Sequence, residues 1–146
     1  MIIIASDHAG YELKEKVKLY LNDKGIEYKD FGVHDTDSVN YAEIGGEVAK
    51  LVAKKDFEFG ILICGTGIGM SIAANKVKEI RAACCSDYFS AKFTRLHNDA
   101  NVLCFGARVV GEGTAAEMID VFLNTPFEGG RHMDRIKTFA DLENGN

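Results

Sequence analysis

The chain alternates between short apolar runs and longer segments in which apolar residues recur every three or four positions. The first pattern is typical of buried strands, and the second is typical of helices with one buried face. Leu13, Val17 and Leu21 form the first helical stripe, and Gly25 follows as a stop signal. The pattern predicts strands over 2–5, 26–31, 59–63, 80–85 and 102–105. It predicts helices around 13–21, 41–52, 87–96 and 115–123, with a shorter one that ends near 76.

Apolar strands that alternate with helices indicate a parallel sheet covered on both faces. We therefore expect a single α/β domain over 1–146, a Rossmann-like sheet of five parallel strands in the flavodoxin-like order 2-1-3-4-5. A further helix is predicted after Pro126, from 131 to about 143, outside this alternation. Its apolar stripe is thin (Met133, Ile136, Phe139), so it either packs against another subunit or lies on the surface of its own domain.

Two polar, glycine-bearing loops follow the first and third strands, at 6–10 and 64–69. Ligands of open parallel sheets bind beyond the carboxyl ends of the strands, where the strand order reverses. In the expected order, strands one and three are neighbours at that reversal. The topology therefore predicts a site that combines Asp7, His8, Cys64 and Thr66.

The second of these loops has the chemistry of an anion site. Gly65, Gly67 and Gly69 leave backbone N–H groups free at a helix start, which suits a phosphate or an enolate oxygen. Cys64 begins the loop, so it is either a thiol activated by the helix end or a buried filler. The spacing G-x-G-x-G departs from the dinucleotide pattern G-x-G-x-x-G. Asp87 lies about 20 residues further on, where a ribose-binding acid would be expected, so a nucleotide-binding module remains an alternative.

A second group of polar residues lies near the fifth strand and the last helix. His97 and Asn98 belong to a polar run that precedes the strand, where a histidine is also a common cap or surface residue. Arg131 and Arg135 share one helix face, which suits a phosphate or carboxylate but also describes solvated charges. Arg108 follows the fifth strand, at the predicted binding edge.

Composition narrows the classes of protein and partner. The net charge of −5 gives no basic field for nucleic acid or an anionic membrane. The apolar runs are too short to cross a bilayer, and the N-terminus lacks the basic region of a signal peptide. The four cysteines form no C-x-x-C pair and no metal spacing with the histidines. We expect a cytoplasmic protein without cofactor or metal, in which Cys84, Cys85 and Cys104 are small apolar strand residues.

Six segments, taken together and in order, resemble the type B ribose-5-phosphate isomerases, which are related to the allose-6-phosphate and galactose-6-phosphate isomerases. They cover almost the whole chain: Ser-Asp-His-Ala-Gly at 6–10, Cys-Gly-Thr-Gly-Ile-Gly-Met-Ser at 64–71, Ile-Arg-Ala-Ala at 80–83, His-Asn-Asp-Ala-Asn-Val at 97–102, Gly-Ala-Arg-Val at 106–109 and Arg-His-x-x-Arg-Ile at 131–136.

The resemblance implies an aldose–ketose isomerase that interconverts ribose 5-phosphate and ribulose 5-phosphate through a cis-enediolate. Cys64 would be the base at C2 and His97 would open the sugar ring, with Thr66 and Asp7 beside the reacting oxygens. Substrate-binding residues would be Asp7, His8, Tyr41, Gly65, Thr66, Gly67, Ile68, Gly69 and Asn98. Phosphate-binding residues would be Arg108, Arg131 and Arg135.

The family divides between a cysteine base at this loop and a glutamate a few residues on. Position 64 is cysteine and position 70 is methionine, so the chain resembles the cysteine type. Around Tyr41, Asn40 and Ala42-Glu43 replace a common Asp-Tyr-Pro-Asp stretch. The family forms homodimers, sometimes paired into tetramers, with sites at the subunit interface. A hexose-phosphate isomerase, a nucleotide-binding module and a silent partner subunit remain the alternatives, although the full set of site residues argues against the last.

Overall fold

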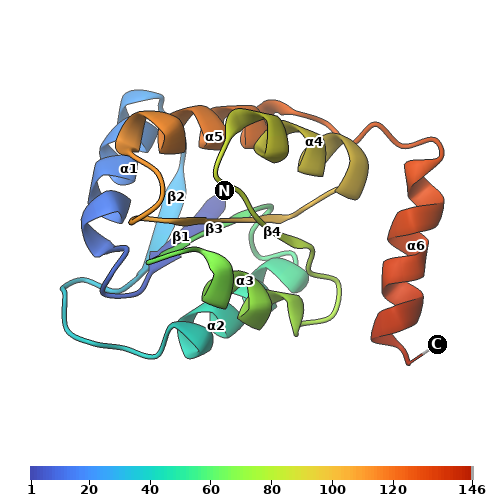
Figure 1. Ribbon diagram of the computed structural model, residues 1–146, viewed down its shortest axis with the longest axis horizontal. Coiled ribbons are helices and arrows are strands. Elements are labelled where there is room, and N and C mark those ends of the chain that lie inside the picture. Colours follow the sequence, from blue (N-terminus) through green and yellow to red (C-terminus); the bar gives the residue numbers. More distant parts are fainter. Residues whose placement is uncertain (146) are drawn as a thin grey trace.

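A computed structural model describes residues 1–145 as a five-stranded sheet between two layers of helices (Figure 1). The strands are β1 (Ile2–Ser6), β2 (Tyr28–Gly32), β3 (Gly60–Cys64), β4 (Ala82–Cys84) and β5 (Val102–Gly106). Every pairing between them is parallel. The predicted α/β class and five-stranded parallel sheet are therefore confirmed.

The helices cover the sheet on both faces, as the alternation predicted. They are α1 (Tyr11–Asp23), α2 (Tyr41–Ala53), α3 (Ile68–Asn75), α4 (Tyr88–Asn98), α5 (Glu112–Asn124) and α6 (His132–Glu143). Figure 1 shows α1, α4 and α5 on one face and α2 and α3 on the other. Each layer buries its own core: Phe105 and Phe122 belong to the first, and Leu62 and Met70 to the second.

The strand order is β2-β1-β3-β5-β4, so the expected order 2-1-3-4-5 is wrong in its last two positions. β5 is buried at all five residues and lies between two neighbours, whereas β4 has no buried residue and forms one edge of the sheet. A short, exposed strand is the better edge strand, because an edge leaves backbone groups unpaired. The reversal between β1 and β3, on which the site prediction depends, is as expected.

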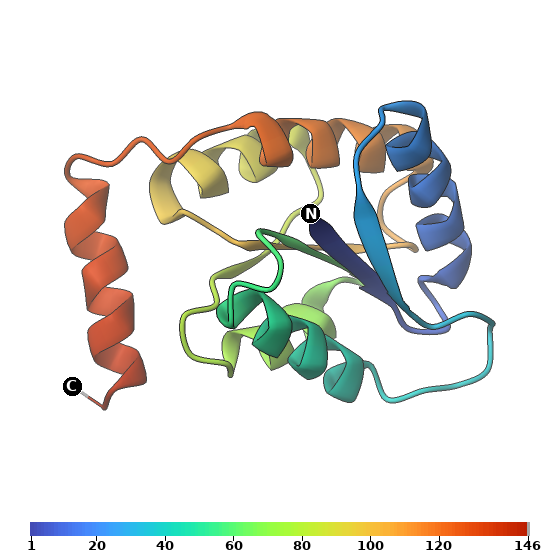
Figure 2. The same cartoon turned by 180° about the vertical axis from the view of Figure 1, so that it is seen from behind.

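Helix α6 stands beside the layered body rather than within it (Figures 1 and 2). It is held near both ends. At its start the His132 ring stacks on that of His97, and at its end the Glu143 carboxylate accepts the Glu79 N–H at 3.1 Å. Between these anchors, Met133 and Leu142 are exposed. No helix over residues 1–145 is long and apolar enough to span a bilayer.

Candidate active site

The loops after β1 and β3 meet at the carboxyl edge of the sheet, as predicted. Asp7 continues the ladder, since its N–H donates to the Ile63 carbonyl at 3.2 Å. The chain then turns back, with the buried Asp7 carboxylate accepting the Gly10 N–H at 3.0 Å. A Cβ at Gly10 would lie 2.3 Å from the Ile63 oxygen, so only glycine allows this approach. The tight turn places the Asp7 carboxylate beside the end of β3.

Cys64 ends β3, and its sulfur is the focus of the second loop. Its side chain is only 4% exposed, and Sγ accepts the Gly67 N–H at 3.1 Å. Gly67 has φ of 82°, and a Cβ there would lie 2.7 Å from the Phe105 backbone, so glycine is required for the turn. Helix α3 begins at the next residue. The donated N–H and the positive end of the helix both stabilise negative charge on the sulfur.

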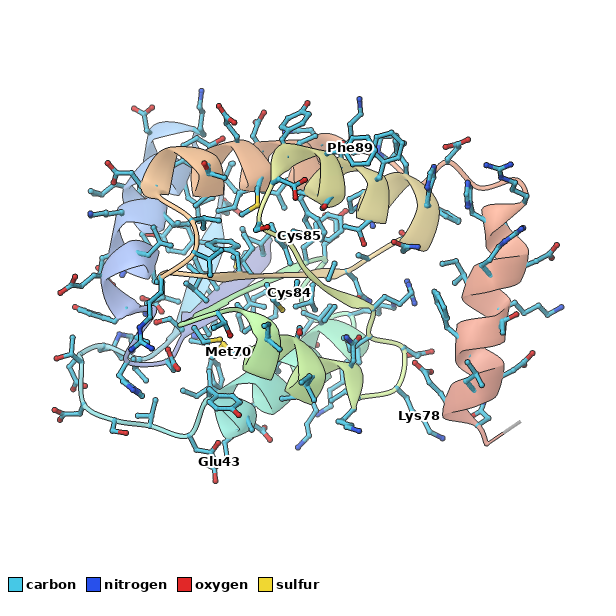
Figure 3. The ribbon with its side chains drawn as sticks, in the orientation of Figure 1. Glu43, Met70, Lys78, Cys84, Cys85 and Phe89 are labelled. Atoms are coloured by element: carbon cyan, nitrogen blue, oxygen red, sulfur yellow. The ribbon has the colours of Figure 1, made fainter. Side chains whose placement is uncertain are left out.

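The other three cysteines have different surroundings. Burial raises the pKa of Cys85 to about 12 and that of Cys104 well above its usual range. Cys84 lies in β4, as predicted for a strand residue, but it is exposed, because β4 is an edge strand with a neighbouring strand on one side only. Partial burial raises the pKa of the Cys84 thiol, and the neighbouring Cys64 sulfur adds a smaller effect in the same direction. Its Sγ lies 3.7 Å from the Thr66 carbonyl oxygen, and Figure 3 shows it on the side of β4 away from Cys85.

Three further predicted residues flank the Cys64 loop. The Arg108 guanidinium lies over Gly65, with Nη1 3.3 Å from where a Cβ would sit. The Tyr41 ring packs on Gly69 so closely that a Cβ would lie 2.4 Å from it. His8 Nδ1 accepts the Val39 N–H at 3.3 Å, which ties it to the loop before α2.

Thr66 and Ile68 complete the loop, because Thr66 Oγ1 accepts the Ile68 N–H at 3.2 Å at the start of α3. The structure thus brings together Asp7, His8, Tyr41, the whole segment 64–69 and Arg108. Met70 is fully buried beneath the loop (Figure 3). Because its side chain is a thioether, this position offers no carboxylate as an alternative base. The Asp87 carboxylate caps α4 by accepting the Ser90 N–H at 2.7 Å. Helix capping therefore explains an aspartate at this position without a bound nucleotide.

The remaining predicted residues lie at the other end of the strands. His97 and Asn98 end α4, before β5 begins at Val102, whereas Cys64 pairs with Gly106 at the far end of β5. A five-residue strand separates the two edges by about 16 Å. No hydrogen bond or ion pair joins the two groups within residues 1–145. One chain therefore does not unite Cys64 with His97, Arg131 and Arg135.

The second group forms a compact cluster of its own. The His97 ring stacks on His132 with centroids 4.2 Å apart, and its Nε2 lies 3.7 Å from Glu128 Oε2. Arg135 Nη1 donates to the Arg131 carbonyl at 2.7 Å, so the arginines are neighbours as their spacing predicted. Sequence reasoning missed Glu128 and His132. His132 falls within the quoted Arg-His-x-x-Arg motif, which was the available signal.

A largely apolar groove of about 760 Å³ runs along the edge strand between β4, α4 and α6. Cys84 and His97 both line it, together with the exposed Phe89 (66%) and Leu142 (63%). Figure 3 shows Phe89 on the outer side of α4. The groove thus connects the flank of the Cys64 loop with the His97 cluster.

Comparison with known proteins shows the family to which the chain belongs. The model of the Ribose/Galactose Isomerase family matches residues 2–139. Ribose-5-phosphate isomerase B of Escherichia coli is 43% identical over 97% of this chain and 95% of its own length. A structure of ribose-5-phosphate isomerase B from Clostridium thermocellum has a TM-score of 0.96 at 46% identity, covering 99% of this chain and 97% of that one.

A structure of ribose-5-phosphate isomerase B from Mycoplasma genitalium with bound ribulose-5-phosphate has a TM-score of 0.92 at 39% identity. It covers 99% of this chain and 97% of that one. The resemblance drawn from the six sequence motifs is confirmed. The chain is an isomerase and belongs to the ribose/galactose isomerase family.

Proposed function

We propose that this isomerase interconverts ribose 5-phosphate and ribulose 5-phosphate, with Cys64 as the base. The observation that carries the proposal is the Cys64 sulfur at the carboxyl edge of the sheet, with the Gly67 N–H donated to it at 3.1 Å. The relatives named ribose-5-phosphate isomerase B support the choice of substrate. All three expected phosphate ligands, Arg108, Arg131 and Arg135, carry the positive charge that a phosphate requires.

The reaction needs a proton to move between neighbouring carbons. The Cys64 thiolate removes the C2 proton of the open-chain aldose, the electron pair of that bond forms the C1–C2 double bond, and the π pair of the C1 carbonyl moves onto O1 to give a cis-enediolate. The thiol then returns a proton to C1, and a proton passes between O2 and O1, which leaves the ketose. Thr66 and the backbone N–H groups of the glycine loop lie where they can stabilise the enediolate oxygens. In other enzymes one such donor contributes about 3 kcal/mol to transition-state stabilisation.

We further propose that the working unit is a homodimer in which the His97 cluster serves the Cys64 loop of the other copy. The two groups lie at opposite edges of one chain, so a site containing both needs two chains. The apolar groove along the edge strand β4 offers a surface that a second copy would cover. Because the groove contacts both Cys84, beside Thr66, and His97, a partner seated there would bring the two kinds of residue together.

Parallel assays with ribose 5-phosphate and allose 6-phosphate test the substrate. We expect turnover of ribose 5-phosphate at a kcat/KM clearly above that for the hexose phosphate. Preference for allose 6-phosphate would assign the hexose reaction instead. Turnover of neither sugar, combined with binding of ATP or NAD, would favour a nucleotide-binding module.

Mixing of two impaired variants, one without the base and one with weakened phosphate binding, tests the shared site. Cys64→Ala and Arg131→Ala chains, unfolded together and refolded as a mixture, should regain activity, because mixed dimers contain one site with both native groups. Each variant refolded alone is the control. A mixture no more active than its parts would mean that each site is built within one chain.

A further inference from the structure

A cluster outside the Cys64 loop has the composition of a metal site. His97, Glu128 and His132 each offer a ligand atom, and these atoms lie within 4.8 Å of one another. The residues come from the end of α4, the segment before α6 and the first residue of α6. Two imidazoles and one carboxylate are a common ligand set for zinc, which leaves a fourth position open.

His132 provides an independent indication that the cluster lacks a ligand. Its side chain is only 9% exposed, and its buried Nε2 has no hydrogen-bond partner in the described part of the chain. A buried ring nitrogen without a partner is costly, and most such groups in proteins are satisfied. This unpartnered nitrogen is available to coordinate a cation.

The other two ligands are accessible from solvent. The His97 and Glu128 side chains are 35% and 56% exposed, and the Nε2 and Oε2 atoms are 3.7 Å apart. A tetrahedral zinc ion holds its ligand atoms about 3.4 Å from one another. The widest separation in the cluster thus needs to shrink by up to about 1.4 Å, and the exposed Glu128 side chain is free to make that movement.

Two features of the cluster oppose a cation and limit its affinity. The imidazoles stack with their planes 14° apart, so His97 must turn out of the stack for one ion to lie in the plane of both rings. Arg131 and Arg135 place positive charge next to the site. The ion would therefore bind reversibly rather than as a permanent part of the structure.

We propose that His97, Glu128 and His132 bind one Zn²⁺ ion per chain, and that Zn²⁺ bound there inhibits the isomerase by occupying His97. The inhibitory effect rests on the proposed function, in which His97 opens the sugar ring. A ring nitrogen bonded to zinc carries no exchangeable proton, so ring opening would stop while the Cys64 loop stayed intact.

A titration of the metal-free, full-length protein with Co²⁺, followed by its visible absorption, tests the site directly. We expect one Co²⁺ per chain, displaced by Zn²⁺, which favours a tetrahedral set of this kind. Glu128→Gln and His132→Ala should each weaken binding about tenfold or more. Glu117→Gln, which removes an exposed carboxylate from α5, is the matched control and should bind as the parent does. Failure of the parent to bind one equivalent would overturn the site.

Activity gives a second, separate readout. Zn²⁺ should inhibit turnover of ribose 5-phosphate by the parent, and Glu128→Gln should need about tenfold more Zn²⁺ for the same fractional inhibition. The Cys64 thiolate is the rival target for zinc. Equal inhibition of Glu128→Gln and the parent would overturn inhibition through this cluster. A parent that binds Co²⁺ but turns over no ribose 5-phosphate would refute the proposed function and leave the metal site standing.

Discussion

The two edges of the sheet carry functional residues of different construction. At the carboxyl edge, the site is built largely from backbone: the Gly67 N–H on Cys64, the Asp7 turn, and glycines that admit Arg108 and Tyr41. At the amino edge, the His97 cluster is built from side chains on α4, on α6 and on the segment before α6, which meet at few points. The first is fixed by the sheet, whereas the second depends on where one outlying helix lies.

This difference explains why the residues at the carboxyl edge are already positioned within one chain, whereas those at the amino edge lie beside an uncovered surface. Strand pairing between β1 and β3 brings Asp7 to Cys64 in any folded copy of the chain. The His97 cluster faces an uncovered apolar groove, and Arg131 and Arg135 form no ion pair with residues 1–145. Chemistry that requires both edges would therefore be controlled by assembly, while the base would be preorganised in each chain.

Removal of the base should have the largest effect. Cys64→Ala should lower isomerisation by about 10⁴-fold or more, and Cys64→Ser nearly as much, since a hydroxyl is a far weaker base. Exchange of the C2 proton with solvent, followed by NMR, should vanish. Cys85→Ala, which removes a buried thiol on the other face of the sheet, is the control and should remain active. Exchange at the parental rate in Cys64→Ala would assign the base elsewhere, with Asp7 as the next candidate.

Loss of His97 should act on a different step. His97→Ala should slow turnover of the cyclic substrate by about 10²–10⁴-fold, the range typical of acid–base groups. Exchange of the C2 proton of open-chain substrate should be much less affected, because Cys64 and its N–H donor lie at the other edge. Steady-state rates compared with exchange rates measure this. If both fall equally, the two edges do not divide the reaction in this way.

Much of this division could be predicted from sequence, and its limits are physical. Periodicity predicted five strands, and the β1–β3 reversal then placed Asp7 beside Cys64. The exchange of β4 and β5 was missed, because local pattern does not report which strand has two neighbours. Cys84 was predicted as a small apolar strand residue, and it does lie in a strand, but its position on an edge strand leaves it exposed. Glu128 was missed because its contact with His97 depends on the path of the loop before α6, which periodicity does not determine.

Alkylation should distinguish the four thiols. Since the thiolate is the nucleophile, a pKa of about 12 leaves Cys85 roughly 10³-fold less reactive at neutral pH than a thiol with an ordinary pKa near 9. Cys104 should be slower still, and Cys84 should react faster as the pH rises, because its raised pKa delays ionisation. Mass spectrometry of peptides after brief iodoacetamide treatment should find Cys64 modified first, in step with inactivation. First modification of Cys84 would show that access outweighs stabilisation of the thiolate.

The arginines of α6 should affect binding more than chemistry. Arg131→Ala and Arg135→Ala should each raise KM by about 10–100-fold with a smaller change in kcat, because the phosphate is held equally in the ground and transition states. Inorganic phosphate should compete with substrate in the parent and lose this effect in the variants. Lys137→Ala, an exposed cation on the same helix, is the control. A fall in kcat at unchanged KM would place these arginines in the reacting part of the site.

The smallest effect is expected from removal of metal ions. In the proposed reaction, a thiolate takes the proton and backbone N–H groups hold the enediolate, so no step at the Cys64 edge calls for a cation. At the other edge, an ion on His97 would block ring opening rather than assist it. Dialysis against EDTA should therefore leave kcat/KM for ribose 5-phosphate unchanged in protein shown to be free of zinc, and should raise it in protein that carries zinc. Activity that is lost on chelation and restored by a divalent ion would contradict both the thiolate mechanism and the inhibitory role of the His97 cluster.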